Sequence, residues 1–209
     1  KSFARDIGLM KEVGIFPVVV HGGGPQIAER LKSKNITSQF VEGLRVTDKD
    51  AIKIVEDVLA NEINTEIVKA INESGGKAIG LSGNKNKLLS AIKLKLEVKD
   101  SDSNIERLVD IGLVGQPTDV NIDLINKYIQ KGKIPVIAPL GIDDDGNSYN
   151  INADTVAGFI AGKLKASKLL LLTDVAGVLD KDKNLISSFT LNEAVKIINE
   201  DFIVGGMKP

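Results

Sequence analysis

The sequence predicts an α/β protein in which helices cover both faces of a mostly parallel sheet. Residues 18–20 and 134–140 are short apolar stretches rich in β-branched side chains, which is typical of buried strands. Residues 2–13 carry apolar side chains at helical spacing. Strand and helix patterns alternate along the chain, and this order favours parallel strands joined by helical crossovers. We therefore expect a three-layer αβα sandwich.

The composition narrows the class of protein. The 209 residues carry a net charge of −1, which argues against a nucleic-acid binder, and include no cysteine, which excludes a disulfide framework. No apolar run approaches the roughly 18 residues that a membrane-spanning helix needs, and no signal peptide is visible, so we expect a cytoplasmic protein. The chain starts without Met inside a helical pattern, so we interpret it as one domain that is cut at both ends.

Capping and turn residues set the expected boundaries of the elements. The expected helices are 2–13, 25–34, 48–72, 122–131, 153–164 and 191–200, and the expected strands are 18–20, 77–81, 88–96, 110–114, 134–140 and 168–172. The expected N-caps are Thr47, Asn121 and Asn152, with a capping box from Thr190 to Glu193. Hairpin turns are expected at 145–146 and before Ile186, and a polar turn at 101–104.

Three consecutive glycines follow the first predicted strand. Gly22, Gly23 and Gly24 precede Pro25, and proline is favoured at the first position of a helix. A strand, a glycine turn and a helix N-terminus together present backbone N–H groups to an anion. The alternative is a tight strand-to-helix turn with no ligand, and the spacing matches neither of the two common glycine motifs for nucleotides.

Two other strand ends carry polar residues. Asp154 falls in the first turn of a predicted helix, where the helix dipole favours a carboxylate. Thr173 and Asp174 follow the leucine-rich stretch 168–172 and could hold a ribose or a phosphate. Open α/β sheets place their sites at the carboxyl ends of strands, whereas the alternatives are a capped helix start and a plain turn.

Three remaining signals have simpler explanations. Arg45 lies in a glycine-flanked loop and is either solvated or paired with a carboxylate. His21 is the only histidine, so we expect a structural, hydrogen-bonded role for it. Residues 143–146 and 180–184 resemble the start of a calcium loop, but each lacks the glycine where that loop requires it, so we expect no metal site.

Five stretches occur along the chain in the order VVVHGGGPQI, GLRVTD, NINADTVAG, LLLLTDVAGVLDKD and GGMKP. Together they resemble the acetylglutamate kinases of the amino-acid kinase family, to which the opening KSFARDIGLMKEVGI is also similar. The resemblance covers essentially the whole chain, and GLRVTD favours N-acetylglutamate over the substrates of sibling kinases. It implies the amino-acid kinase fold, with a central, mainly parallel sheet between two layers of helices.

The resemblance also implies an activity and a set of site residues. The kinase would transfer the γ-phosphoryl group of ATP, carried with Mg²⁺, to the side-chain carboxylate of N-acetyl-L-glutamate in arginine biosynthesis. Residues 1–149 would form the amino-acid-binding lobe, and 150–209 the start of the nucleotide-binding lobe. The implied residues are Gly23 and Gly24 for the reacting groups, Arg45 and Asn150 for the substrate, Asp154 to orient two catalytic lysines, and Thr173, Asp174, Gly177, Leu179 and Met207 for the nucleotide.

By the same resemblance the two lysines fall outside residues 1–209, one in the family's first strand and one directly after Pro209. We assign no catalytic role to Lys208. Two alternatives stay open, namely a sibling kinase for acetylated aminoadipate in lysine biosynthesis and a non-catalytic amino-acid sensor on the same fold. The family forms dimers and hexamers, so we expect a homo-oligomer with no nucleic-acid or membrane partner.

Overall fold

A computed structural model describes residues 2–99, 106–173, 177–182 and 184–198. Its helices are α1 (Ser2–Glu12), α2 (Gly24–Ser33), α3 (Lys49–Glu56), the π-helical segment η1 (Asp57–Ile63), α4 (Asn64–Glu73), α5 (Ile122–Gln130), α6 (Ala153–Leu164) and α7 (Leu191–Ile198). Its strands are β1 (Val19–Val20), β2 (Phe40–Val41), β3 (Leu44–Arg45), β4 (Ala78–Ser82), β5 (Leu89–Lys93), β6 (Leu96–Lys99), β7 (Glu106–Val109), β8 (Gly115–Val120), β9 (Ile134–Ala138), β10 (Leu140–Ile142) and β11 (Ser148–Asn150).

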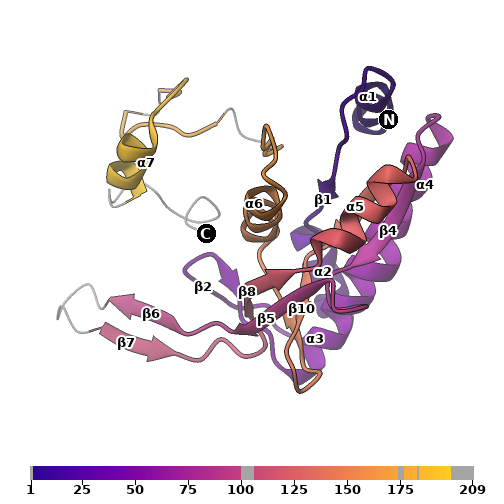
Figure 1. The fold of residues 1–209 in the computed structure, drawn as a ribbon. Helices are drawn as coiled ribbons and strands as arrows, with labels where there is room; N and C mark the ends of the chain where they lie inside the picture. The colour runs from indigo at the N-terminus through magenta and orange to yellow at the C-terminus, as the bar shows by residue number, and fades with distance from the viewer. Residues whose placement is uncertain (1, 100–105, 174–176, 183, 199–209) are drawn as a thin grey trace.

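Two sheets follow one another along the centre of the molecule (Figure 1). In the first sheet, β9 pairs with β1 and β4 in parallel. In the second, of order β11-β10-β5-β8, β10 is parallel to β5, whereas the β10–β11 and β5–β8 pairs are antiparallel. Only Pro139 separates β9 from β10, and proline has no N–H to donate to a ladder. The single strand expected at 134–140 is therefore two strands, one in each sheet.

Strand β9 shows how the layers form, because its successive side chains point to opposite faces. Ile137 packs in one hydrophobic cluster with side chains of α5 and α6, such as Ile125 and Val156. Ile134 and Val136 pack on the other face with side chains of α1 and α4. Helices thus cover both faces of a parallel sheet, which confirms the predicted fold class.

The helix expected at 48–72 forms but changes its winding in the middle. It runs as α3, η1 and α4, and Asp48 is its N-cap, because Asp48 Oδ1 accepts hydrogen bonds from the N–H groups of Asp50 (3.0 Å) and Ala51 (2.8 Å). The expectation that Thr47 caps the helix was wrong. The Thr47 side chain is fully buried, and its hydroxyl donates to Arg45 O at 2.9 Å instead.

Other helix ends follow their local signals. Asn121 Oδ1 accepts from Leu124 N at 2.9 Å, and Asn152 Oδ1 accepts from Thr155 N at 2.9 Å, so both predicted caps are confirmed. The capping box is also present, since Thr190 N donates to Glu193 Oε2 at 2.7 Å. The two hairpin turns form as expected before β11 and before Ile186.

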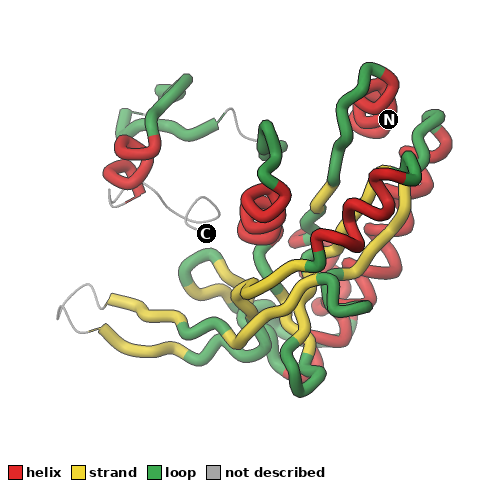
Figure 2. Tube along the Cα trace, in the orientation of Figure 1, coloured by secondary structure: helices red, strands yellow, loops and turns green. Residues whose placement is uncertain are grey.

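Three predicted strands differ from the structure. The stretch 168–172 is not a strand, and Figure 2 shows it as loop. Its four leucines are 46–76% exposed, because no described strand lies beside it to accept its backbone hydrogen bonds. The stretch 88–96 breaks after β5, and 110–114 makes only isolated bridges between β7 and β8. The turn expected at 101–104 lies outside the described residues.

Replacing two of the glycines by alanine should have opposite effects on stability. A Cβ on Gly83 would lie 1.9 Å from Leu140 O, a backbone atom that cannot move aside, so Gly83→Ala should lower the free energy of unfolding by about 2 kcal/mol or more. A Cβ on Gly158, inside α6, meets nothing within 4 Å, so Gly158→Ala should raise it by about 0.5–1 kcal/mol through helix propensity. Urea denaturation of the full-length protein measures the free energy of unfolding of both variants. Equal effects of the two substitutions would contradict the close packing of Gly83 against Leu140 O.

Candidate functional site

A cavity of about 190 Å³ lies at the carboxyl end of β1, beside the end of β11. It is smaller than the roughly 300–1,000 Å³ typical of pockets for drug-sized ligands, so it suits a ligand the size of an amino-acid derivative. Its lining comes from six separate stretches of the chain: Gly22, Gly23, Gly24 and Ile27; Phe40, Gly43, Leu44 and Arg45; Leu59; Val114; Pro139; and Asn150, Ile151, Asn152 and Ala153. The fold therefore brings together four residues that the sequence singled out, namely Gly23, Gly24, Arg45 and Asn150.

The glycine turn supplies hydrogen-bond donors to this cavity. Helix α2 has Gly23 as its N-cap and carries Pro25 in its first turn, and no side chain caps it. Within the part of the chain that the structure describes, no acceptor takes the N–H groups of Gly22, Gly23 or Gly24. The positive end of the helix dipole lies at the cavity, because all three glycines line it, and a helix N-terminus with unpaired N–H groups is an arrangement that binds anions.

Arg45 supplies a buried positive charge to the same cavity. Its side chain is 7% exposed, Nη2 donates to Gly24 O at 2.9 Å, and Nη1 donates to Ser38 Oγ. The guanidinium lies 4.6 Å from the centre of the Phe40 ring. Burial lowers the pKa of Arg45, and no carboxylate of the described residues forms an ion pair with it. A buried charge without a partner costs free energy, and an anionic ligand would remove that cost.

Asn150 is oriented by a residue that the sequence did not single out for the site. Asn150 Nδ2 donates to Thr47 Oγ1 at 3.1 Å, and Thr47 in turn donates to Arg45 O. With Nδ2 held in this way, Asn150 Oδ1 is left to accept a hydrogen bond inside the cavity. No local signal could have shown this pair, because the two residues are 103 positions apart.

The remaining predicted residues lie outside the cavity. Asp154 is exposed in the first turn of α6, directly after Ala153, which does line the cavity. Thr173 lies in the loop after α6, and Leu179 forms an isolated bridge with Leu185 beyond Gly177. Asp174 and Met207 are outside the described residues. In Figure 1, helix α7 lies apart from the sheet, on the far side of α6.

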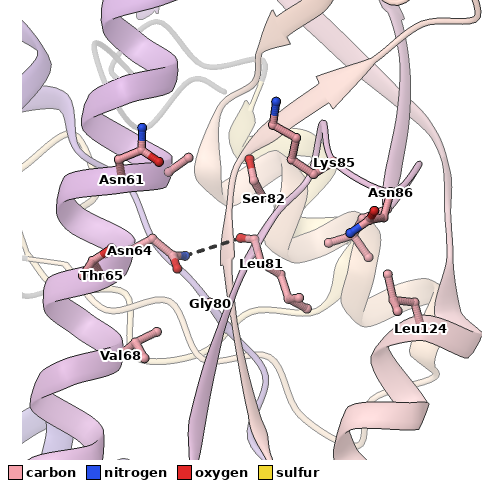
Figure 3. A pocket seen from close by; sticks show the side chains of 12 residues that line it. Asn61, Asn64, Thr65, Val68, Gly80, Leu81, Ser82, Lys85, Asn86 and Leu124 are labelled. Atoms are coloured by element: carbon pink, nitrogen blue, oxygen red, sulfur yellow. Dashed lines mark hydrogen bonds between the residues drawn. The ribbon is translucent and has the colours of Figure 1, made fainter.

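A second cavity, of about 390 Å³, lies between η1, α4 and β4 (Figure 3). It contains none of the predicted site residues, and its lining includes Asn61, Asn64, Ser82 and Lys85. We place the site in the smaller cavity, because the unpaired guanidinium and the free N–H groups are there. Among the described residues no cluster of His, Asp or Glu could hold a metal ion, and no helix has the length and apolar character to span a bilayer.

His21 stands between β1 and the glycine turn and is buried. Its Nδ1 lies 3.1 Å from Gly22 O, and its Nε2 lies 3.1 Å from Asn64 Nδ2. Burial lowers the pKa of His21, and the hydrogen bond to Gly22 opposes this effect only in part. The structural role expected for this histidine is consistent with its neutral, hydrogen-bonded ring.

An α/β fold with a glycine turn, a helix N-terminus and a buried arginine around one small cavity defines a class of proteins that bind small anionic molecules. The model of the amino acid kinase family matches residues 1–209, and the chain belongs to that family.

Individual relatives agree with this assignment. The chain is 54% identical over 209 residues to an acetylglutamate kinase from Rhodospirillum centenum, covering 100% of this chain and 68% of the relative. It is 53% identical to an acetylglutamate kinase from Afipia carboxidovorans, covering 100% of this chain and 71% of the relative. Among solved structures, smu.665 from Streptococcus mutans superposes with a TM-score of 0.85 at 29% identity, over 99% of this chain and 79% of that one.

The buried histidine predicts how stability depends on pH. An unfolded histidine has a pKa of about 6.5, and the folded His21 has a lower one, so on acidification the unfolded chain binds a proton first. The free energy of unfolding should therefore fall as the pH drops below about 7, where the unfolded histidine begins to bind its proton, by at most about 1.4 kcal/mol per pH unit. No charged side chain of the described residues contributes to this pKa shift.

The control for this prediction is His21→Gln in the full-length protein, which removes the titrating group. Urea denaturation of both proteins at several pH values gives the difference, in which the titration of the carboxylates cancels. Parallel curves for the two proteins would contradict a neutral, buried His21.

Proposed function

We propose that the chain is the substrate-binding part of an acetylglutamate kinase. The enzyme transfers the γ-phosphoryl group of ATP to the side-chain carboxylate of N-acetyl-L-glutamate. The identity of 52–54% to proteins of that name, over the whole of this chain, supports both the activity and the substrate. We further propose a cytoplasmic homo-oligomer as the working form.

The observation that carries the proposal is that one small cavity contains both the guanidinium of Arg45, which forms no ion pair with a described carboxylate, and the N–H groups of the glycine turn beside it. These two groups offer sites for two anions, and N-acetylglutamate has two carboxylates. Arg45 would bind the α-carboxylate through its guanidinium fork, and the N–H groups of Gly23 and Gly24 would bind the reacting carboxylate. Asn150 Oδ1 would accept the hydrogen bond of the substrate's amide N–H.

The chemistry of the transfer fits these groups. The side-chain carboxylate attacks the γ-phosphorus, the bond from that phosphorus to the bridging oxygen breaks, and ADP leaves with the electron pair. A carboxylate is already a nucleophile and needs no general base. The difficulty is the approach of one anion to another, so positioning and charge neutralisation supply most of the rate. Glycine N–H groups pointing at the oxygens of the phosphoryl group act in this way.

The rest of the chain would serve the nucleotide. We propose that 1–149 form the amino-acid side of the site and that 150–209 begin the nucleotide side, with Asp154 orienting lysines outside these residues. ATP would lie along Thr173, Asp174, Gly177, Leu179 and Met207. Mg²⁺ would be carried by the ATP phosphates and would neutralise their charge during the transfer.

The experiment that tests the proposal measures ADP formation by the full-length protein with MgATP and N-acetylglutamate. Arg45→Lys keeps the charge but loses the fork, so it should raise KM for N-acetylglutamate by about tenfold, roughly 1.4 kcal/mol, and leave KM for ATP unchanged. An unchanged KM for N-acetylglutamate would contradict the proposal that Arg45 binds the α-carboxylate. Higher turnover with acetylated aminoadipate would assign the protein to the sibling kinase, and no turnover with either substrate would rule out the kinase.

Asp154 gives an independent test. Loss of a charge at a helix start costs about 0.3–1 kcal/mol of stability and leaves activity unchanged. Loss of a carboxylate that orients catalytic lysines should instead lower kcat by at least about 100-fold, roughly 2.7 kcal/mol, with the fold intact. We expect the second result for Asp154→Asn in the full-length protein. A kcat within about threefold of the wild type would show that Asp154 only supports the helix start.

A further inference from the structure

The carboxyl-terminal parts of three parallel strands meet at one buried side chain, Asn64, the first residue of α4. Asn64 Nδ2 lies 3.1 Å from Nε2 of His21, 2.9 Å from Val136 O on β9 and 3.4 Å from Leu81 O on β4. Figure 3 shows the bond to Leu81 crossing from the helix to the strand. Two of these neighbours are carbonyl oxygens, so the nitrogen of the amide must face them; its two hydrogens serve three acceptors, and one hydrogen is therefore shared.

This donor fixes the state of the histidine ring. Since Asn64 Nδ2 donates to His21 Nε2, that nitrogen must be unprotonated, and the ring proton lies on Nδ1. Nδ1 then donates to Gly22 O at 3.1 Å. The C=O of Gly22 and the N–H of Gly23 belong to one planar peptide group. Two hydrogen bonds thus connect the helix, through the histidine ring, to the Gly22–Gly23 peptide group, which lines the cavity.

The π-helical segment lets the helix come this close. A Cβ on Gly23 would lie 2.4 Å from Ile63 Cδ1 and 2.9 Å from Leu59 Cδ2, both on η1. A Cβ on Gly80 would lie 2.1 Å from Asn64 Oδ1. A Cβ at Gly80 would displace the hydrogen-bonded Asn64 side chain, and one at Gly23 would push aside the ends of Ile63 and Leu59, so contact with the helix, and not the backbone angle, is what favours glycine at both positions. A π-helical turn inside a longer helix is frequently found at a functional site, because it re-aims side chains locally.

We propose that Asn64 and His21 are positioning residues that hold the Gly22–Gly23 peptide in the orientation needed for phosphoryl transfer. They do not touch the substrate, and the proposal rests on the function proposed above. Holding this peptide affects a donor used at the reacting carboxylate, not the contact of Arg45 with the other end of the ligand. Loss of the pair should therefore lower kcat and leave KM for N-acetylglutamate nearly unchanged.

The first test compares two asparagines of the same helix in the full-length protein. Asn72 also ties α4 to β4, because Asn72 Oδ1 accepts from Ala78 N at 2.7 Å, but it does so at the end of the strand far from the glycine turn. Asn64→Leu should lower kcat by about 30-fold or more, since a misplacement of about 1 Å can cost about 100-fold. Asn72→Leu should change kcat less than about threefold at a comparable loss of stability.

The second test uses histidine variants that differ in reach. An asparagine side chain places its amide nitrogen near the position of Nδ1, where it can donate to Gly22 O, whereas a glutamine reaches only the position of Nε2 and loses that bond. His21→Asn should therefore lower kcat less than His21→Gln, which should match Asn64→Leu. Equal kcat values for the two histidine variants, or equal losses for Asn64→Leu and Asn72→Leu, would overturn the proposal.

A third measurement needs no turnover. In ¹⁵N NMR spectra, the His21 ring signals, identified by their loss in His21→Gln, should show a neutral ring protonated at Nδ1. Asn64→Leu should move this proton toward Nε2 and shift the amide signals of residues 22–24, and Asn72→Leu should do neither. Unchanged spectra in Asn64→Leu would overturn the proposal. A spectral change in a protein that does not phosphorylate N-acetylglutamate would refute the proposed function and leave the hydrogen-bond chain in place.

Discussion

The guanidinium of Arg45 is buried against a backbone carbonyl, a hydroxyl group and an aromatic ring, and no carboxylate of the described residues neutralises it. Desolvating a charge is costly, so the folded protein tolerates this arrangement only because the surrounding structure compensates elsewhere. The stabilising free energy that offsets this cost comes from the packing of helices on the sheet, and this packing does not depend on the charge of Arg45. An anion bound in the cavity would neutralise the guanidinium, and this would contribute to the free energy of ligand binding.

The residues around Arg45 are held in place by contacts between segments that are distant in sequence. Thr47 lies two residues after Arg45, and its backbone pairs with the segment before β8, where Leu113 N donates to Thr47 O at 2.6 Å. A Cβ on Gly112 would lie 2.2 Å from that same oxygen, so only glycine allows the approach. Thr47 Oγ1 also accepts a hydrogen bond from Asn150 Nδ2, so the segment after the hairpin β2–β3 is joined directly to the end of β11. The cation and the amide acceptor are therefore fixed relative to each other before any ligand arrives.

The sequence was sufficient for features that depend on neighbours in the chain and insufficient for those that depend on distant partners. The caps at Asn121 and Asn152 were predictable, since each side chain bonds an N–H three residues ahead. The alternation of strands and helices fixed the fold class in the same way. Thr47 and Asp48 are both good caps, and only the burial of Thr47 by distant strands decides between them. The leucine run at 168–172 showed apolar character, but a strand also needs a neighbour, which composition does not reveal. The glycine turn, Arg45 and Asn150 were named by resemblance, whereas Asn64, whose three contacts lie 17 to 72 residues away, carried no signal.

Recognition and chemistry draw on different parts of this framework. Arg45 and Asn150 come from a hairpin and a strand end that are fixed to each other through Thr47. The glycine turn is held by α4 as well, through Asn64 and His21, and the bond from Arg45 Nη2 to Gly24 O joins the two units directly. A substrate that spans the cavity would touch both units, one at each carboxylate. The distance between its two carboxylates would then be set by how the hairpin unit and the helix unit pack on the sheet, so selection between acidic substrates of different length would depend on that packing as well as on the residues in contact.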